Sequence, residues 1–390
     1  MTNRINQADN VGLVKTQFYT FAENQKLKLV SGKELGPVTI AYETYGRLNS
    51  KKSNAILILH ALSGSAHAAG YNSPDDRHAG WWDIYIGPGK AFDTDKYFII
   101  SSNVIGGCTG STGPSSIDPQ TQKPYSLSFP LITVQDMVEA QRHLLDYLEI
   151  DKLLAVAGGS MGGMQALSWS IQYPERINSV IALATSFLVS AQGIAFNEVG
   201  RQAIMTDPNW NKGDYYGNTN PAVGLSLARM IGHITYLSET HMHEKFGRNY
   251  QETNNDEFSF DAEYMVASYL KYQGSKFVDR FDANSYLYIT RAIDLFDLRK
   301  DQDESLFSVF ENTQANFFIA SFSSDWLYPS AMSKDIVKAL RASGKNATYI
   351  EIESDKGHDS FLIESKTLEA NIANFLKSEF NKVNGTNRSK

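Results

Sequence analysis

The stretch Leu153-Leu154-Ala155-Val156-Ala157-Gly158-Gly159-Ser160-Met161-Gly162-Gly163-Met164-Gln165 decides the expected fold. An apolar run short enough for a buried strand ends at a Gly-Gly-Ser-Met-Gly-Gly turn, and residues 164–171 then follow an amphipathic pattern typical of a helix. In the order strand, tight turn and helix, a G-x-S-x-G match predicts a serine lifted above the end of the strand as a nucleophile. Ser160 is therefore the predicted nucleophile. The alternative interpretation is a glycine-rich connection with an incidental serine.

Length and composition limit the classes of protein to which this sequence can belong. The 390 residues suffice for one large domain with an insertion or for two domains, and 42% hydrophobic with 20% charged residues is typical of a globular protein. The net charge of −7 and the absence of a long Lys/Arg run argue against a nucleic-acid binder. An anionic substrate would therefore have to meet a local positive field, because the overall charge is negative.

Cysteine content and hydropathy indicate the compartment. Cys108 is the single cysteine, which excludes an internal disulfide and fits a reducing environment. The first ten residues lack the apolar core of a signal peptide, and the most apolar long stretch, residues 179–196, is interrupted by polar residues. We expect a cytoplasmic protein that binds no membrane.

Predicted strands and helices alternate on both sides of the serine. Val38–Tyr45 is expected to form an antiparallel edge strand, and Ala55–Leu59 has the continuous apolar run of a central parallel strand. Further strands are predicted at residues 97–103, 180–184, 316–322 and 347–352, with helices at 134–148, 333–340 and 368–380 and a frayed end at 381–390. This alternation predicts an α/β fold with a mostly parallel, doubly wound sheet, whose sites lie at the carboxyl ends of the strands.

The alternation stops between about residues 186 and 296. Helical periodicity is found there at residues 195–205, 221–237, 262–273 and 283–296, separated by polar or Gly/Pro/Asn-rich breaks. We interpret residues 186–296 as an all-helical lid over the strand ends, and residues 1–185 with 297–390 as the α/β core.

Two further residues complete a predicted catalytic set with Ser160. Asp325 and His358 each follow a predicted strand, which gives the chain order Ser, Asp, His. An unactivated serine is a poor nucleophile, so His358 would accept its proton and Asp325 would orient the imidazole. The backbone amides of Leu62, just past the strand that ends at residue 59, and of Met161 are the expected oxyanion donors. Rival bases are His60, His67 and His143, and rival carboxylates are Asp355 and Asp359.

Three other patterns contain side chains that could bind a ligand or react. The glycine-rich run 106–116 lacks a Walker pattern, so we expect a structured wall of the site, with Cys108 as a buried thiol and not a second nucleophile. Arg229, His233 and Tyr236 recur on one helical face, where the arginine and tyrosine could bind a carboxylate or form an interhelical salt bridge with a packed tyrosine. His241-Met242-His243-Glu244 lacks a third spaced ligand and is expected to be a solvated helix face, so no metal site is predicted.

Several motifs together resemble one family. They are Tyr42-Glu43-Thr44-Tyr45-Gly46, His60-Ala61-Leu62-Ser63-Gly64, the 106–116 loop, Gly158-Gly159-Ser160-Met161-Gly162-Gly163, Ala228-Arg229-Met230-Ile231-Gly232-His233-Ile234-Thr235-Tyr236, Asp282-Ala283-Asn284-Ser285-Tyr286 and Gly357-His358-Asp359. Across residues 18–380 the sequence is similar to the homoserine O-acetyltransferases of the α/β-hydrolase type. It departs from the commonest family pattern at Ser65, where an acidic residue is frequent.

The resemblance implies a function and a set of binding residues. It implies acetyl-CoA as a co-substrate with no permanently bound cofactor, L-homoserine as the acceptor, a role in methionine biosynthesis, and a homodimer formed through the helical lid. It also implies that Arg229 and Tyr236 hold the carboxylate of the amino acid and that Asp359 holds its ammonium group. The expected reaction is ping-pong acyl transfer through an acetylated Ser160. Alternatives are succinyl transfer or a serine acceptor within the same family, a carboxylesterase, and a non-enzymatic binding scaffold.

Overall fold

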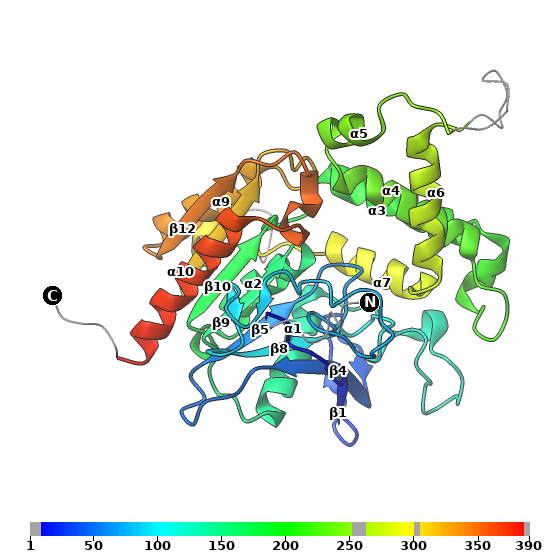
Figure 1. Cartoon of the computed structure of the whole chain (residues 1–390). Coiled ribbons are helices and arrows are strands. Elements are labelled where there is room, and N and C mark those ends of the chain that lie inside the picture. The colour runs from blue at the N-terminus through cyan, green and yellow to red at the C-terminus, as the bar shows by residue number, and fades with distance from the viewer. Residues whose placement is uncertain (1–8, 252–262, 300–304, 386–390) are drawn as a thin grey trace.

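An eight-stranded sheet forms the centre of the computed structural model, which describes residues 9–251, 263–299 and 305–385 (Figure 1). The strand order is β1-β4-β8-β5-β9-β10-β11-β12, and every neighbouring pair is parallel except β1–β4 and β4–β8. The strands are β1 (Gln17–Phe21), β4 (Val38–Tyr45), β5 (Ala55–Leu59), β8 (Phe98–Ser102), β9 (Ala155–Gly159), β10 (Ser179–Leu183), β11 (Asn316–Phe322) and β12 (Ala347–Ile352). Two short ribbons, β2 (Leu27–Lys28) with β3 (Glu34–Leu35) and β6 (Ile86–Gly87) with β7 (Phe92–Asp93), lie outside this sheet.

Both faces of the sheet are covered, as a mostly parallel sheet requires. Successive side chains of a strand point to opposite faces, and in β5 Leu57 and Leu59 join one apolar core while Ile56 and Ile58 join the other. The first core is shared with α1 (Val134–Tyr147), α2 (Met161–Gln172) and α9 (Ser330–Ala342), and the second with α10 (Lys366–Val383). The doubly wound sheet predicted from the strand and helix alternation is therefore confirmed.

Six α-helices of the described residues lie between β10 and β11. They are α3 (Ala191–Met205), α4 (Ala222–Tyr236), α5 (Glu239–Phe246), α6 (Met265–Val278), α7 (Ala283–Asp294) and the single-turn α8 (Leu306–Val309). Of these, α3 to α7 form a layer beyond the carboxyl ends of the strands, and α8 packs beside the end of α9, at the amino ends of β11 and β12. In Figure 1, α3 to α6 project to one side of the sheet, and α7 lies between them and the core. Of its residues, ten are buried, from Ala283 to Ile293, so α7 joins the helical layer to the core.

The structure differs from the expectations at three places, and one expected helix boundary lies outside the described residues. β4 is not an edge strand, because β1 pairs outside it; β1 carries mostly exposed side chains, so hydropathy gave no signal for it. α5 was not predicted as a separate helix. Residue 262, the expected start of α6, lies outside the described residues. Residues 381–383 belong to α10 and are not frayed, while 386–390 and the first eight residues lie outside the described part.

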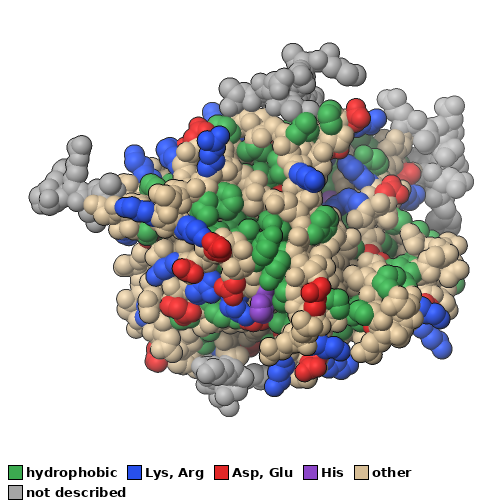
Figure 2. Space-filling model, turned by 90° about the horizontal axis from the view of Figure 1, so that it is seen from below, with side chains coloured by type: hydrophobic (Ala, Val, Ile, Leu, Met, Phe, Trp, Pro, Cys, Tyr) green, Lys and Arg blue, Asp and Glu red, His purple; other side chains and the backbone are tan. Residues whose placement is uncertain are grey.

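No helix in the described ranges is both long and apolar enough to cross a bilayer. Figure 2 shows one face of the molecule, on which lysine and arginine side chains are interspersed with aspartate and glutamate. That face therefore presents no broad field of one sign. A local positive field has to be sought near the site itself.

Candidate active site

Ser160 occupies a strained turn between β9 and α2. Its backbone angles, φ 56° and ψ −124°, lie in a region that residues with a side chain rarely adopt. The Ser160 amide donates to the Leu183 carbonyl at 2.9 Å, and the Thr185 hydroxyl donates to the Ser160 carbonyl at 2.9 Å, so both sides of the peptide are held. A Cβ at Gly162 would lie 2.0 Å from the Leu59 carbonyl oxygen, which explains why this position of the turn is glycine.

The structure brings Ser160, His358 and Asp325 into one hydrogen-bonded chain. His358 Nε2 lies 2.9 Å from Ser160 Oγ, and His358 Nδ1 lies 2.8 Å from Asp325 Oδ2. A carboxylate only accepts hydrogen bonds, so Nδ1 carries the proton and Nε2 is free to accept one from the serine. The other carboxylate oxygen, Oδ1, accepts from the amides of Leu327 and Tyr328 at 3.0 and 2.9 Å, which fixes the orientation of Asp325.

Aromatic rings enclose the His358 imidazole. Its centre lies 5.1 Å from that of Tyr328, 5.6 Å from Phe361 and 6.1 Å from Tyr236. Burial by itself would lower the pKa of His358, but attraction and hydrogen bonding to Asp325 oppose burial, and the pKa is raised above its usual 6.5. A base with a raised pKa is a stronger proton acceptor, which suits the removal of a proton from a hydroxyl.

The end of α4 is held between the loops that carry the aspartate and the histidine. Trp326 Nε1 donates to the Leu237 carbonyl at 2.9 Å, and the Ser238 hydroxyl donates to the Asp355 carbonyl. A Cβ at Gly357 would lie 2.6 Å from the Tyr236 carbonyl, and Gly357 has a φ of +71°, so only glycine fits this close approach. These contacts fix the position of α4 relative to the loops that carry Asp325 and His358.

Leu62 and Met161, the predicted oxyanion donors, are neighbours of Ser160 in the cavity lining and in the chain, respectively. Met161 begins α2, so its amide is one of those at a helix N-terminus without an intrahelical acceptor. Leu62 lines the same cavity as Ser160. This cavity is about 50 Å³, space for only one or two waters, so a substrate has to widen it. It is lined further by Gly193, Phe196, Asn197, Ile231, Gly232, Thr235, Tyr236, Tyr286, Ile293, Leu327 and Tyr328.

The three predicted substrate-binding residues lie at different depths. Tyr236 lines the Ser160 cavity, whereas Arg229 and Asp359 do not. The Arg229 guanidinium lies 5.5 Å from the centre of the Tyr236 ring, and its Nη1 lies 3.4 Å from Ser63 Oγ. Burial raises the pKa of Asp359, while attraction to His358 and Arg229 opposes that rise. These three residues are therefore neighbours of the His358 loop, but Arg229 forms no interhelical salt bridge among the described residues.

The rival bases are engaged elsewhere. His60 is buried, its Nε2 accepts from the Val104 amide at 3.1 Å, and burial lowers its pKa to about 4. His67 Nδ1 lies 3.0 Å from Glu43, and His143 Nε2 lies 3.4 Å from Glu139. None of the three contacts Ser160. The rival carboxylate Asp355 pairs with Lys356 at 2.7 Å.

Two other sequence patterns lie outside this hydrogen-bonded chain. Cys108 is partly buried, and burial raises the pKa of its thiol, which disfavours the nucleophilic thiolate. His241 and Glu244 on α5 come within 4.8 Å of Asp355, but the Lys356 ammonium lies 3.1 Å from His241 Nδ1 and occupies that ring nitrogen. This cluster carries a cation of its own, and we assign no metal to it.

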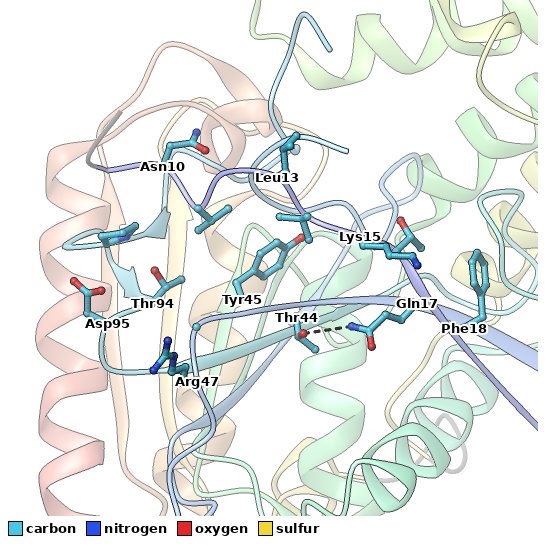
Figure 3. Close-up of a pocket in the computed structure, with 15 residues that line it drawn as sticks. Asn10, Leu13, Lys15, Gln17, Phe18, Thr44, Tyr45, Arg47, Thr94 and Asp95 are labelled. Carbon is cyan, nitrogen blue, oxygen red and sulfur yellow. Dashed lines mark hydrogen bonds between the residues drawn. The ribbon is translucent and has the colours of Figure 1, made fainter. Parts of the chain in front are cut away.

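A larger groove of about 1000 Å³ lies away from the serine, between the N-terminal segment and β4 (Figure 3). Lys15, Arg47 and Asp95 are among its lining residues, and Gln17 Nε2 donates to Thr44 Oγ1 at 3.5 Å across its floor. None of the predicted site residues lines it, so size alone does not locate the candidate active site.

Sequence reasoning missed Arg280, which lies in the connection between α6 and α7. Its Nη1 donates to the Ser63 carbonyl at 3.1 Å, so it reaches the loop that carries Leu62. Arg280 precedes the Asp282-Ala283-Asn284-Ser285-Tyr286 motif by two residues, and that proximity was the signal available.

A serine on a strand-turn-helix, followed in the chain by a carboxylate and a histidine that meet it at the carboxyl ends of a mostly parallel sheet, defines the α/β-hydrolase class. The family model described as the alpha/beta hydrolase fold matches residues 54–365. A homoserine O-acetyltransferase of Methanohalobium evestigatum is 58% identical over 371 residues, which make up 95% of this chain and 75% of that protein. The chain belongs to the homoserine O-acetyltransferase family of α/β hydrolases.

Two solved structures that are similar to this chain are named for different reactions. Homoserine O-acetyltransferase from Bacillus anthracis is similar with a TM-score of 0.85 and 30% identity, covering 97% of this chain and 98% of that chain. Esterase E22 is similar with the same TM-score and identity, covering 93% of this chain and 100% of that chain. A protein named for acyl transfer and one named for ester hydrolysis therefore share this backbone, so the backbone alone does not distinguish the two reactions.

Proposed function

We propose that this protein transfers an acetyl group from acetyl-CoA to the side-chain hydroxyl of L-homoserine, giving O-acetyl-L-homoserine and CoA for methionine biosynthesis. The observation that carries the proposal is the hydrogen-bonded chain Ser160, His358 and Asp325 beside Arg229, a cation without a carboxylate partner in the described residues. Family membership supports the choice of donor and acceptor. A cytoplasmic location is part of the proposal and accords with a single cysteine in the chain.

The first half-reaction acylates the serine. Ser160 Oγ attacks the thioester carbonyl while its proton passes to His358 Nε2, which is 2.9 Å away. Amides of Leu62 and Met161 stabilise the oxyanion, each such donor being worth about 2.7–4 kcal/mol in a well-formed site. His358 then protonates the departing CoA thiolate, and acetyl-Ser160 remains.

The second half-reaction transfers the acetyl group to the acceptor. Arg229 and Tyr236 bind the carboxylate of homoserine and Asp359 binds its ammonium group, so the hydroxyl is held against the acetyl-serine. His358 removes the hydroxyl proton, the alkoxide attacks the acetyl carbonyl, and His358 returns the proton to Ser160. Positioning gives the bound alcohol its advantage over water.

Residues 186–296 form the lid in this proposal, and residues 1–185 with 297–390 form the core. Support comes from α3 to α7, which lie between β10 and β11, and from the Ser160 cavity, whose lining includes α3, α4 and α7 residues. A lid that excludes water protects the acetyl-serine from hydrolysis. Opening of the lid would supply the space that the small cavity lacks.

The reaction of the purified protein tests the proposal directly. We expect acetyl-CoA with L-homoserine to give rapid thiol release, and succinyl-CoA or L-serine to give much slower release. Thiol release that is equally fast without any amino acid would identify an esterase, the chemistry named for E22. A preference for succinyl-CoA or L-serine would replace the donor or the acceptor and keep the acyl-serine mechanism.

Arg229→Ala should separate the two half-reactions. Loss of a charge-assisted contact worth about 1.5–3 kcal/mol predicts a rise of about 10- to 100-fold in the KM for homoserine. Acylation of Ser160 by acetyl-CoA alone, measured as the burst of CoA release, should change by less than about threefold. Arg291→Ala, an exposed arginine on α7, is the matched control. Equal losses in both half-reactions would contradict the assigned role.

We further propose that a second copy of this chain packs on the helical layer to form a homodimer. Val223, Leu227 and Ile234 form an apolar stripe on α4, and they are 67%, 44% and 40% exposed. Light scattering should find a dimer, and Val223→Asp should raise its dissociation constant at least about tenfold. Val30→Asp, at an exposed valine outside the lid, is the control. A monomeric wild-type protein would refute this proposal.

A further inference from the structure

Two arginines lie side by side at the candidate active site without a carboxylate partner. Within the described ranges, no aspartate or glutamate oxygen lies within 4.0 Å of Arg229 or Arg280. By contrast, Arg201 on α3 pairs with Asp294 at 2.7 Å, and Lys271 on α6 pairs with Glu263 at 3.0 Å. Other cations of the layer, such as Lys276 and Arg291, also lack an ion pair among the described residues. What sets Arg229 and Arg280 apart is that both contact Ser63, next to Leu62.

The two guanidinium groups share the same neighbours. Arg229 lies 4.7 Å and Arg280 lies 5.1 Å from the centre of the Phe277 ring. Arg229 reaches the Ser63 hydroxyl and Arg280 donates to the Ser63 carbonyl, so both touch the residue that follows Leu62. Phe277 is 1% exposed, so its ring is held in place by packing, and both guanidinium groups lie against that ring.

The two cations lower the pKa values of neighbouring groups, although the Asp359 carboxyl, which attracts Arg229, compensates part of their field. Burial, followed by repulsion from Arg229, Arg280 and Lys245, lowers the pKa of His233 to about 3, so this histidine stays neutral and adds no charge. Partial desolvation of its guanidinium beside Phe277, followed by repulsion from Arg229, also lowers the pKa of Arg280, although the side chain as a whole is exposed to solvent. Two like charges held together in this way are stabilised when an anion binds between or beside them.

The two arginines differ in how exposed they are to solvent, and this difference indicates which anionic substrate each could bind. Arg229 is half-buried and contacts Tyr236, which lines the Ser160 cavity, whereas Arg280 is exposed to solvent. The donor of the proposed reaction has its acyl carbonyl at one end of a long flexible arm and its phosphates at the other. With the carbonyl at Ser160, the phosphates have to be held on the solvent side of Arg229. A protein of net charge −7 needs a local cation there to attract a polyanion.

Resting on the proposed function, we propose that Arg280 binds a phosphate group of the acyl-CoA donor at the entrance of the active site. Its planar guanidinium can donate two hydrogen bonds to one phosphate, which an ammonium group cannot do in the same geometry. Arg229, deeper in the site, remains for the carboxylate of the acceptor. The two arginines therefore divide the two anionic substrates between them.

Comparison of two donors tests this assignment. Acetyl-CoA and S-acetyl-N-acetylcysteamine carry the same thioester, but only the first carries phosphates. Arg280→Gln should lower kcat/KM for acetyl-CoA about 10- to 100-fold and leave that for the short thioester within about twofold. The KM for homoserine should not change. Arg280→Lys should recover part of the loss, and Lys276→Gln, the same loss of charge four residues earlier, should behave as wild type.

Calorimetric binding of CoA gives a readout that needs no turnover. Arg280→Gln should weaken CoA binding by the same factor, and Lys276→Gln should not. Equal losses with both donors, unchanged CoA binding, or a rise confined to the KM for homoserine would overturn the assignment. Failure of the proposed function would be seen differently, as absence of homoserine-dependent thiol release in the wild-type protein.

Discussion

Ser160→Ala should abolish acyl transfer, lowering kcat by about 10⁴- to 10⁶-fold. The oxygen that attacks the thioester is removed, and only binding and the oxyanion donors then remain to assist the reaction. The strained backbone at Ser160 is imposed by the packing of β9 against α2, so the variant should keep its fold. Mass spectrometry after mixing with acetyl-CoA should find one added acetyl group on the wild type and none on the variant.

Ser170→Ala is the matched control for this variant. Ser170 lies on α2 and is fully buried, and its hydroxyl donates only to the Leu167 carbonyl at 2.7 Å. We expect a loss of about 0.5–1.5 kcal/mol of unfolding free energy and an unchanged kcat. If Ser160→Ala kept more than about one hundredth of the wild-type rate, another nucleophile would have to be sought.

Asp325→Asn should lower kcat by about 10⁴-fold and also move the pH profile. An asparagine side chain can donate its amide hydrogen to His358 Nδ1, which places the remaining imidazole proton on Nε2, the wrong side for accepting one from Ser160. The wild-type kcat/KM should fall at acidic pH, because a protonated His358 cannot act as a base, with an apparent pKa above 6.5. Removing the carboxylate removes what raises that pKa, so the acidic limb should shift to lower pH.

Asp355→Asn is the control for this second prediction. Asp355 precedes His358 by three residues, but it is paired with Lys356 and does not contact the imidazole. Its rate and pH profile should match the wild type. An acidic limb that stays in place in Asp325→Asn would show that the limb reports a group other than His358.

The sequence by itself predicted the α/β class and the elements that carry the chemistry. Strand β9, the turn at Ser160 and helix α2 follow from a local pattern, because burial on both faces demands a continuous apolar run and the tight turn demands glycine. Asp325 and His358 could be named because each lies in a loop after a predicted strand, although β12, before His358, is an edge strand in which only Ile352 is buried. Strand β1 could not be predicted, because an edge strand with exposed side chains has no continuous apolar run.

Only the tertiary structure shows which side chains from distant parts of the sequence lie close together. The 2.9 Å contact between residues 160 and 358 and the shared position of Arg229 and Arg280 on Phe277 join segments far apart in the chain. Periodicity in the sequence indicates only which face of a helix or strand is buried. It does not indicate whether an arginine or lysine on that element has a carboxylate partner in the folded protein. The local pattern therefore determined the strand, the turn and the nucleophile, whereas the depth of each arginine and the small volume of the cavity depend on how the helical layer packs over the sheet.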